Sequence, residues 1–316
     1  MDNPAHTPSL VFWGTPDFSV PILTALAEHF RVVAIVTAPD RLAGRKNIIT
    51  PPPIKKAGRS LGIPVLQPEK LLPHICAEIP PADITVVAAY GKILPDALLK
   101  KPIHGCLNVH PSLLPRWRGP SPIQAAFLAG DEKTGVSIML MDEKMDHGPI
   151  IARQEIIIGA DTVETLSKKL SLLSAEMLCE IIPRWIAGRI VPSPQNHEKA
   201  TYCKIIKKAD GKIVWSASAV DIERHIRAYE GWPGGYTFWV RKKTRLQLAI
   251  RTARLVSDPA VPVPPPGTIT VAKDHMYIGT GNGALEVLML RPEGGRDMSA
   301  SSFMRGHPEI QGAVLE

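Results

Sequence analysis

Residues 105–119, with the sequence GCLNVHPSLLPRWRG, join a short apolar run to a proline-interrupted loop rich in polar and cationic side chains. Residues 106–109 predict a strand, and Asn108 and His110, two positions apart, then point to the same face of it. Asp146 follows another strand-like run and can supply a carboxylate to the same crevice. An amide, an imidazole and a carboxylate placed together can polarise a carbonyl group and move a proton.

The sequence before this stretch alternates between apolar strands and amphipathic helices. Residues 10–13 and 31–37 are short and apolar, and residues 18–26 between them carry apolar side chains at helical spacing. Residues 83–90 have the β-branched, apolar composition of a strand that is buried on both faces. Strand, helix and strand in this order predict an α/β fold, a Rossmann-like, mostly parallel sheet.

The carboxyl ends of two predicted strands carry the candidate site. One strand ends at Tyr90 and Gly91, and the other runs into residues 108–111. In open α/β sheets, ligands bind outside such carboxyl ends, near the point where the strand order reverses. The first turn, after residues 10–13, holds one glycine and a proline, so it lacks the GxGxxG fingerprint of dinucleotide binding. A nicotinamide-dependent enzyme is therefore disfavoured.

A proline-rich polar stretch separates two regions of different pattern. Residues 1–188 carry the α/β pattern, residues 189–209 predict a linker, and residues 210–316 predict short strands with one helix. This second region fits a smaller OB-like β-barrel, a type common among nucleic-acid binders. Residues 279–283, GTGNG, resemble a phosphate-binding glycine loop, but Asn-Gly between two strands is more often a hairpin turn.

Composition restricts the class of protein. With 45% hydrophobic and 21% charged residues over 316 positions, the chain has the balance of a soluble globular protein. We expect no membrane association, because no run reaches the roughly 18 apolar residues that span a bilayer. The N-terminus lacks the pattern of a secretion signal. Four scattered cysteines, none in a CxxC pair, argue against a zinc site and indicate a reducing, cytoplasmic environment.

The net charge of +7 is unevenly distributed. Residues 201–316 hold 16 Lys and Arg against 11 Asp and Glu, which leaves +5 (16 − 11) for that third. Such an excess suits a polyanion such as nucleic acid, although an ordinary basic domain has the same signature. Residues 38–53 predict a long loop with three cations, Arg41, Arg45 and Lys46. It can reach over a ligand or a phosphate backbone, or simply be a solvated surface loop.

The spacing of Asn108, His110 and Asp146 does not by itself decide which chemistry they support. Neither Ser112 nor Cys106 lies in a nucleophile-elbow motif, so covalent catalysis is disfavoured. Direct transfer of a one-carbon or acyl group to an amine needs only the amide, imidazole and carboxylate. A metal site that recruits His104 and His147 is a weaker alternative, since only one histidine ligand is definite. In a purely structural alternative, the three polar side chains only form hydrogen bonds within their own loop turns.

The stretch 105–120, with DHGP at 146–149, resembles the formyltransferases that use 10-formyltetrahydrofolate. Three further segments, GTPDF at 14–18, PDRLAGR at 39–45 and RAYEGWPGGY at 227–236, narrow this resemblance to the methionyl-tRNA formyltransferase family. The resemblance covers nearly the whole chain in the right order. It implies a Rossmann-like catalytic domain joined by a linker to an OB-like domain.

The resemblance also implies a reaction and its residues. The formyl group of 10-formyltetrahydrofolate would pass to the α-amino group of methionine on initiator tRNA, without a metal. Asn108, His110 and Asp146 match the catalytic residues of the family. The implied folate-site positions are Tyr90, Gly91, Ser112, Leu113, Leu114 and Pro115.

The tRNA contacts implied by the resemblance lie in the basic loop, at Arg41, Arg45 and Lys46. We expect a cytoplasmic monomer without an obligate protein partner. Two alternatives remain. A sugar-nucleotide or glycinamide formyltransferase shares the Asn-His-Asp core but does not account for the basic loop together with residues 227–236. A catalytically inactive RNA-binding module would not account for the intact trio.

Overall fold

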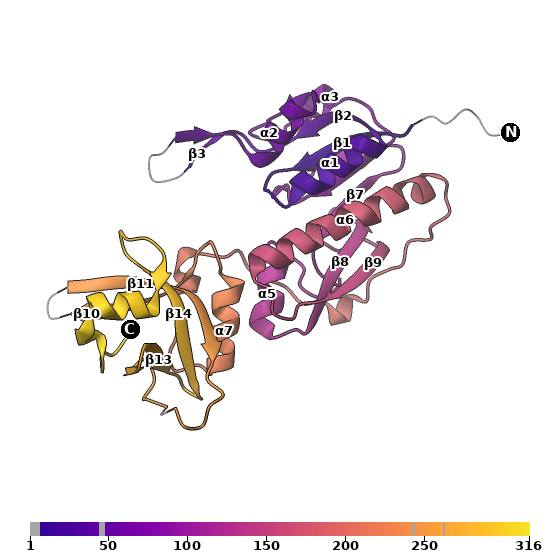
Figure 1. Ribbon diagram of the computed structural model, residues 1–316. Coiled ribbons are helices and arrows are strands. Elements are labelled where there is room, and N and C mark those ends of the chain that lie inside the picture. The colour runs from indigo at the N-terminus through magenta and orange to yellow at the C-terminus, as the bar shows by residue number, and fades with distance from the viewer. Residues whose placement is uncertain (1–6, 44–47, 242–243, 262) are drawn as a thin grey trace. The chain divides into compact units, whose positions relative to one another are not determined.

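A computed structural model describes residues 7–43, 48–241, 244–261 and 263–316. These residues divide into two compact units. The first comprises the described residues up to Pro122, with Lys133–Ile157 and Leu166–Lys204, and the second comprises Ile123–Glu132, Ile158–Thr165 and Ile205–Glu316. Each unit is built around a sheet of its own (Figure 1). The sequence predicts a first domain at residues 1–188, a linker at 189–209 and a second domain at 210–316, and these boundaries stay a prediction.

The first unit holds a seven-stranded sheet in the order β5-β2-β1-β6-β7-β8-β9. Its strands are β1 (Ser9–Gly14), β2 (Arg31–Val36), β5 (Val65–Leu66), β6 (Ile84–Ala88), β7 (Cys106–His110), β8 (Lys133–Leu140) and β9 (Ile150–Ile157). Pairing is parallel from β5 to β7 and antiparallel at β8 and β9. The strand order reverses between β1 and β6, which creates a switch point. The predicted Rossmann-like, mostly parallel sheet is confirmed.

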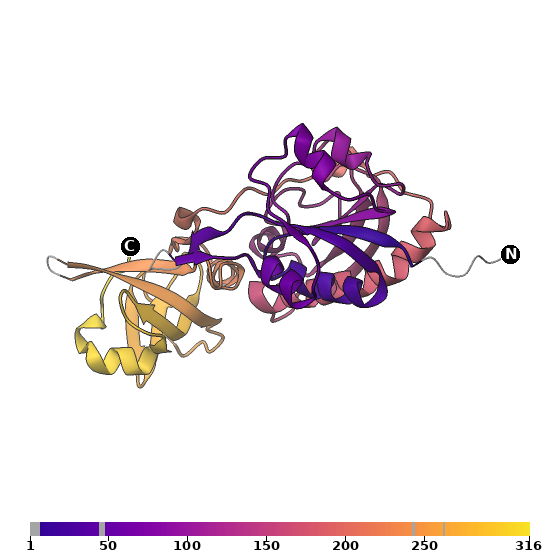
Figure 2. The same cartoon turned by 90° about the horizontal axis from the view of Figure 1, so that it is seen from above.

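Helices cover both faces of this sheet (Figure 2). The helices of the N-terminal two-thirds of the chain are α1 (Ser19–His29), α2 (Pro53–Ser60), α3 (Pro73–Glu78), α4 (Asp96–Leu99), α5 (Pro122–Ala129) and α6 (Val163–Ile186). One apolar cluster joins Val11 and Trp13 of β1 to Leu98 of α4 and to Ile79 at the end of α3. In the part of the chain that is described, no helix combines the length and apolarity needed to cross a membrane.

The segment 38–53 differs from its prediction as an irregular loop. It contains β3 (Arg41–Ala43) and β4 (Ile48–Thr50), which pair in antiparallel register. The β-branched run Ile48-Ile49-Thr50 favours a strand, and pairing with β3 satisfies its backbone. Arg41 is exposed on β3. The predicted contact residues Arg45 and Lys46 lie outside the described residues.

The second unit holds an antiparallel sheet in the order β10-β11-β14-β13-β12, with β15 paired to β14. Its strands are β10 (Gly235–Arg241), β11 (Thr244–Leu255), β12 (Ile269–Ala272), β13 (His275–Gly279), β14 (Ala284–Pro292) and β15 (Met298–Ser299), and its helices include α7 (Ala219–Ala228) and α8 (Ala300–Gly306). Gly279 pairs with Ala284, so residues 280–283 form a hairpin turn. The hairpin interpretation of this glycine-rich segment is therefore confirmed.

The C-terminal residues join the two edges of this sheet. On one side, Glu316 exchanges backbone hydrogen bonds of 2.9 and 3.2 Å with Phe238 of β10. On the other, the Ala313 carbonyl accepts a bond of 2.8 Å from Ile269 of β12, and Leu315 donates one of 2.9 Å to Gly267. This closure is what a small barrel requires. The OB-like classification itself stays a prediction.

Candidate active site

The structure brings Asn108, His110 and Asp146 together in the first unit. Asn108 and His110 lie on β7, while Asp146 lies in the loop that joins β8 to β9. One Asp146 oxygen, Oδ1, lies 3.5 Å from Asn108 Nδ2 and 3.6 Å from His110 Nδ1. The His110 side chain is only 5% exposed and that of Asp146 only 13% exposed. The three groups therefore meet in a largely desolvated space, where electrostatic interactions are stronger than in water.

A backbone carbonyl orients the His110 ring. Nε2 lies 2.8 Å from the Trp117 carbonyl oxygen, which can only accept a hydrogen bond. Nε2 must therefore carry a proton, and in the neutral ring the lone pair is then on Nδ1, the atom that faces Asp146. Nδ1 is thus placed to receive a proton, with a carboxylate beside it to stabilise the resulting imidazolium.

The loop backbone around the trio is held in unusual conformations. Asp146 has φ +49° and Trp117 has φ +60°, in the left-handed region that side chains other than glycine seldom adopt. The second Asp146 oxygen, Oδ2, accepts a hydrogen bond of 2.8 Å from the Gly119 N–H. Such conformations persist only where surrounding contacts enforce them, and they concentrate at functional sites.

The predicted folate positions 112–115 lie in the loop after β7, and a hydroxyl group on β8 braces this loop. Ser112 and Leu114 are fully buried, whereas Leu113 and Pro115 are partly exposed. The Ser137 hydroxyl on β8 donates to the Ser112 carbonyl at 2.7 Å and accepts from the Leu114 N–H at 3.0 Å. Only the half-exposed members therefore offer side-chain surface to a ligand.

Tyr90 and Gly91 lie directly beyond β6, at its carboxyl end, as the sequence suggests. The Tyr90 ring packs edge-on against Trp13 at 4.9 Å between centroids, and burial raises the pKa of Tyr90 to about 12. Gly91 is exposed. The phenol stays neutral at physiological pH and contributes an apolar ring.

A cavity of about 550 Å³ lies in the first unit, and its lining includes Cys106 and His147, which adjoin the trio in sequence. Its lining residues come from the start of β7, the end of α4 and the loop before Asp146, and they are Asp96, Leu99, Lys100, Gly105, Cys106, Leu140, Met141, Asp142, Glu143, Lys144 and His147. The volume and the mixture of apolar wall and charged rim are typical of small-molecule sites. The six predicted folate positions are not among these residues. Sequence reasoning missed most of this wall: Gly105, Cys106 and His147 lie within the motifs but were not assigned to the folate, and the other lining residues lie outside the motifs.

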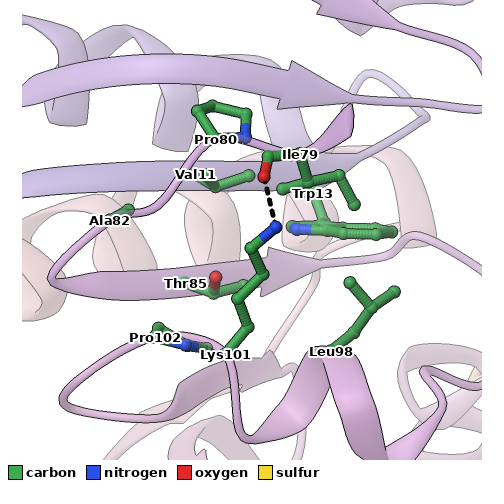
Figure 3. Close-up of a pocket in the computed structure, with 9 residues that line it drawn as sticks. All are labelled: Val11, Trp13, Ile79, Pro80, Ala82, Thr85, Leu98, Lys101 and Pro102. Carbon is green, nitrogen blue, oxygen red and sulfur yellow. Dashed lines mark hydrogen bonds between the residues drawn. The ribbon is translucent and has the colours of Figure 1, made fainter. Parts of the chain in front are cut away.

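A second cavity, shown in Figure 3, is too small for a substrate. It measures about 10 Å³ and lies among residues that include Trp13, Thr85 and Lys101. The Lys101 ammonium group donates to the carbonyl oxygens of Cys76 and Ile79. The cavity has room for about one water molecule. Through its two hydrogen bonds, Lys101 ties the chain after α4 to the end of α3.

Two side chains that carry nucleophilic atoms are placed unfavourably for covalent chemistry. Burial raises the pKa of the Cys106 thiol to about 12. The Ser112 hydroxyl is fully buried and donates to the Arg116 carbonyl at 2.6 Å. Within residues 7–43, 48–241, 244–261 and 263–316, no three His, Cys, Asp or Glu side chains come together as metal ligands would.

Two family patterns cover most of the chain. The pattern described as Formyl transferase matches residues 9–182, and that described as Formyl transferase, C-terminal domain, matches residues 205–308. A methionyl-tRNA formyltransferase from Myxococcus xanthus is 43% identical over 97% of this chain and 97% of its own length. Another from Geobacillus sp. is 44% identical over 94% of both chains. The chain belongs to the methionyl-tRNA formyltransferase family. The resemblance that the sequence motifs predict is thereby confirmed.

Solved structures share the fold at low sequence identity. An N-formyltransferase from Helicobacter canadensis, in complex with folinic acid and dTDP-3-aminofucose, is 17% identical with a TM-score of 0.66 and covers 88% of this chain and 98% of its own. HypX from Aquifex aeolicus, in complex with tetrahydrofolic acid, is 15% identical with a TM-score of 0.62. That match covers 95% of this chain and 47% of HypX.

The second unit of this family member carries cations stacked on aromatic rings. The Arg245 guanidinium lies 3.7 Å from the centroid of the Phe238 ring, and Arg241 lies 4.6 Å from that of Trp239. Phe238 in turn packs edge-on against Tyr236 on the same face of β10. Trp239 lies on the other face of β10 and is buried, so the partly exposed cation and rings that share a face are Arg245, Phe238 and Tyr236. An arginine over an aromatic ring is a combination that binds nucleic acids by charge and by stacking.

Sequence reasoning missed three residues that contact the loops around the trio. Arg118 lies in the quoted stretch without an assigned role, and Gln195 and Thr201 lie in the segment 189–209 that predicts a linker. In the structure, Thr201 accepts a bond of 2.9 Å from the Trp117 N–H, and Gln195 contacts both Arg118 and the Asp146 backbone. No local pattern signals these contacts, because each joins residues about 50 or more positions apart.

Proposed function

We propose that this protein transfers the formyl group of 10-formyltetrahydrofolate to the α-amino group of methionine esterified to initiator tRNA. The observation that carries this proposal is the largely desolvated cluster of Asn108, His110 and Asp146, whose sequence neighbours Cys106 and His147 line a cavity of about 550 Å³. Membership of the methionyl-tRNA formyltransferase family supports the choice of donor and acceptor.

The geometry supports direct attack of the amine on the formyl carbon. As the C–N bond forms, the carbonyl oxygen gains negative charge, and the Asn108 amide can donate a hydrogen bond to it. His110 Nδ1, opposite the Nε2–H that is bound to Trp117, accepts a proton from the attacking nitrogen. Asp146 stabilises the imidazolium until the proton passes to the nitrogen of the departing tetrahydrofolate, when the original C–N bond breaks.

We assign the cavity beside the trio to the folate. Cys106 lies two residues before Asn108, and His147 directly follows Asp146, so two residues of its lining adjoin the catalytic positions in sequence. The apolar wall suits a flat heterocycle, and the charged rim suits the polar groups of a folate. Ser112–Pro115 and Tyr90–Gly91 remain our proposal for the neighbouring walls.

We assign the tRNA to the basic loop and the second unit. Three observations support this assignment: the predicted contacts at Arg41, Arg45 and Lys46, the excess of +5 in residues 201–316, and the contact of Arg245 with the Phe238 ring on β10. We further propose a monomer, because one chain supplies the trio and the cavity. A charged tRNA as acceptor places the activity in the cytoplasm, where translation takes place.

The test is formyl transfer from 10-formyltetrahydrofolate to methionyl initiator tRNA by the purified protein, with free methionine and uncharged tRNA as control acceptors. We expect a formylated product with the charged tRNA alone. Transfer to a small amine instead would favour a sugar-nucleotide or glycinamide formyltransferase. If the protein bound the tRNA without transfer or folate binding, an RNA-binding module would replace our proposal.

A further inference from the structure

A strap formed by residues 193–203 lies along both loops of the catalytic site. At its start, Ser193 exchanges two backbone hydrogen bonds of 2.8 Å with Ile150, the first residue of β9. Near its end, the Arg118 N–H donates to the Thr201 carbonyl at 2.9 Å, and the Cys203 N–H donates to the Arg118 carbonyl at 2.8 Å. The strap therefore pairs with the chain just after Asp146 and with the loop that orients His110.

The strap fits so closely against this loop that one position there must be glycine. A Cβ added to Gly119 would lie 2.7 Å from the Cys203 carbonyl oxygen, and Gly119 also has φ +111°. The same Gly119 donates its N–H to the Asp146 carboxylate. The strap thus packs directly on the backbone group that binds the catalytic carboxylate.

Gln195 is the one strap residue with a buried side chain, at 7% exposure. Its amide nitrogen donates to the Asp146 carbonyl at 3.0 Å and to the Gly148 carbonyl at 2.7 Å. Its amide oxygen accepts from Arg118, at 2.6 Å from Nη2 and 3.2 Å from Nε. Both donors and both lone pairs of the amide are used. A side chain satisfied on every side has a single orientation.

Arg118, the partner of Gln195, is a buried cation with neutral partners. It is 2% exposed, and among the described residues no carboxylate lies within ion-pair distance of it. Its remaining contacts are His197 Nδ1 at 2.9 Å and the Tyr202 hydroxyl at 3.4 Å, both on the strap. A buried guanidinium is tolerated only when its N–H groups are bonded, so Arg118 fixes the oxygen end of Gln195.

We propose that Gln195 is a positioning residue that holds Asp146 in register with His110. Its oxygen end is fixed by Arg118, and its nitrogen end binds the backbone of the residue that carries the carboxylate. Asp146 needs such support because its φ of +49° is unfavourable for a residue with a side chain. This inference rests on the proposed function, in which Asp146 stabilises the protonated His110.

Two substitutions separate the two ends of the amide. Gln195→Ala removes both ends, whereas Gln195→Glu keeps oxygen acceptors for Arg118 but turns the donors toward Asp146 and Gly148 into acceptors. We expect both variants to lower kcat about tenfold to 100-fold, since small displacements of reacting groups have effects of this size. We expect KM for both substrates to change less than about twofold. Glu198→Ala, which truncates an exposed side chain three positions further along the strap, is the matched control and should behave as wild type.

The imidazole ¹⁵N resonances of His110 provide a readout that does not depend on turnover. They should shift in Gln195→Glu and stay unchanged in Glu198→Ala. If Gln195 served only to bury Arg118, Gln195→Glu would keep the wild-type kcat and the wild-type His110 resonances, and that result would overturn the inference. If wild type itself gave no formyl transfer, the proposed function would fail, while the resonances would still decide whether Gln195 positions the loop.

Discussion

At the scale of single residues, spacing was informative where a strand carries the functional groups. Asn108 and His110 share a face of β7 because strand side chains alternate, and this follows from the sequence. The approach of Asp146 was predicted only as a possibility, since a loop decides it. The bond from His110 to the Trp117 carbonyl had no signal in the sequence, because Trp117 reaches that position through a backbone at φ +60°.

Truncation of the two β7 residues should separate catalysis from stability. Asn108→Ala and His110→Ala should each lower kcat on the order of 100-fold or more, because each removes a group that interacts with the transition state. His110 is 4% exposed and bonded to Trp117, so its truncation should also lower the free energy of unfolding by about 1–3 kcal/mol. Asn108 is partly exposed, and its truncation should leave stability nearly unchanged.

Steady-state formyl transfer and thermal unfolding measure the two effects. A folded Asn108→Ala variant with near-normal turnover would refute the assignment of Asn108 as the oxyanion donor.

At the scale of elements, apolar periodicity predicted most strands and helices. β2 and β6 are short β-branched runs buried between layers, and α6 presents a continuous apolar side. The β3–β4 pair was missed because strands of three residues carry little periodic signal. The loop between β8 and β9 was recognised only as a turn, although its path decides where Asp146 lies.

Gly148 is where this loop turns back to the sheet, and alanine should not be tolerated there. A Cβ at this position would lie 1.8 Å from the Leu140 carbonyl oxygen, a backbone atom held in β8. Gly148→Ala should therefore displace residues 141–149, lower the free energy of unfolding by about 1–3 kcal/mol and lower kcat, because Asp146 moves with the loop.

Gly306, at the end of α8, is the matched control, since a Cβ there meets nothing within 4 Å. Chemical denaturation and turnover of Gly148→Ala and Gly306→Ala test this prediction. Equal stability of the two variants would contradict it.

At the scale of the whole molecule, the excess of positive charge is a property on which both the sequence and the structure give information. The net charge of +7 and its concentration in the last third follow directly from the residues. The use of this charge depends on where the cations lie at the surface, as Arg245 does over the partly exposed Phe238 ring of β10. Charge alone was compatible with an ordinary basic protein, and only family membership gives it a tRNA as the proposed partner.

Affinity for the charged tRNA should fall steeply with salt. If about four phosphates are neutralised, Kd should rise roughly 100-fold between 50 and 200 mM salt, because bound counterions are released from the nucleic acid. Affinity for 10-formyltetrahydrofolate should change far less over the same range, since most of its contact is with an apolar wall. A titration of both ligands at several salt concentrations tests this, and a flat tRNA response would remove the electrostatic argument.

The sequence by itself determined the fold class, the family and the Asn-His-Asp trio. These depend on short-range patterns, such as β-branched runs, alternation along β7 and contiguous motifs, which survive without knowledge of the fold. Only the tertiary structure decided that residues 193–203 pack on the catalytic loops, that the cavity forms beside Asp146, and that Gln195 binds Arg118. Each of these brings together groups that are far apart in the chain. Contacts of that kind depend on which distant segments the fold brings side by side, and the local sequence around each residue does not reveal this.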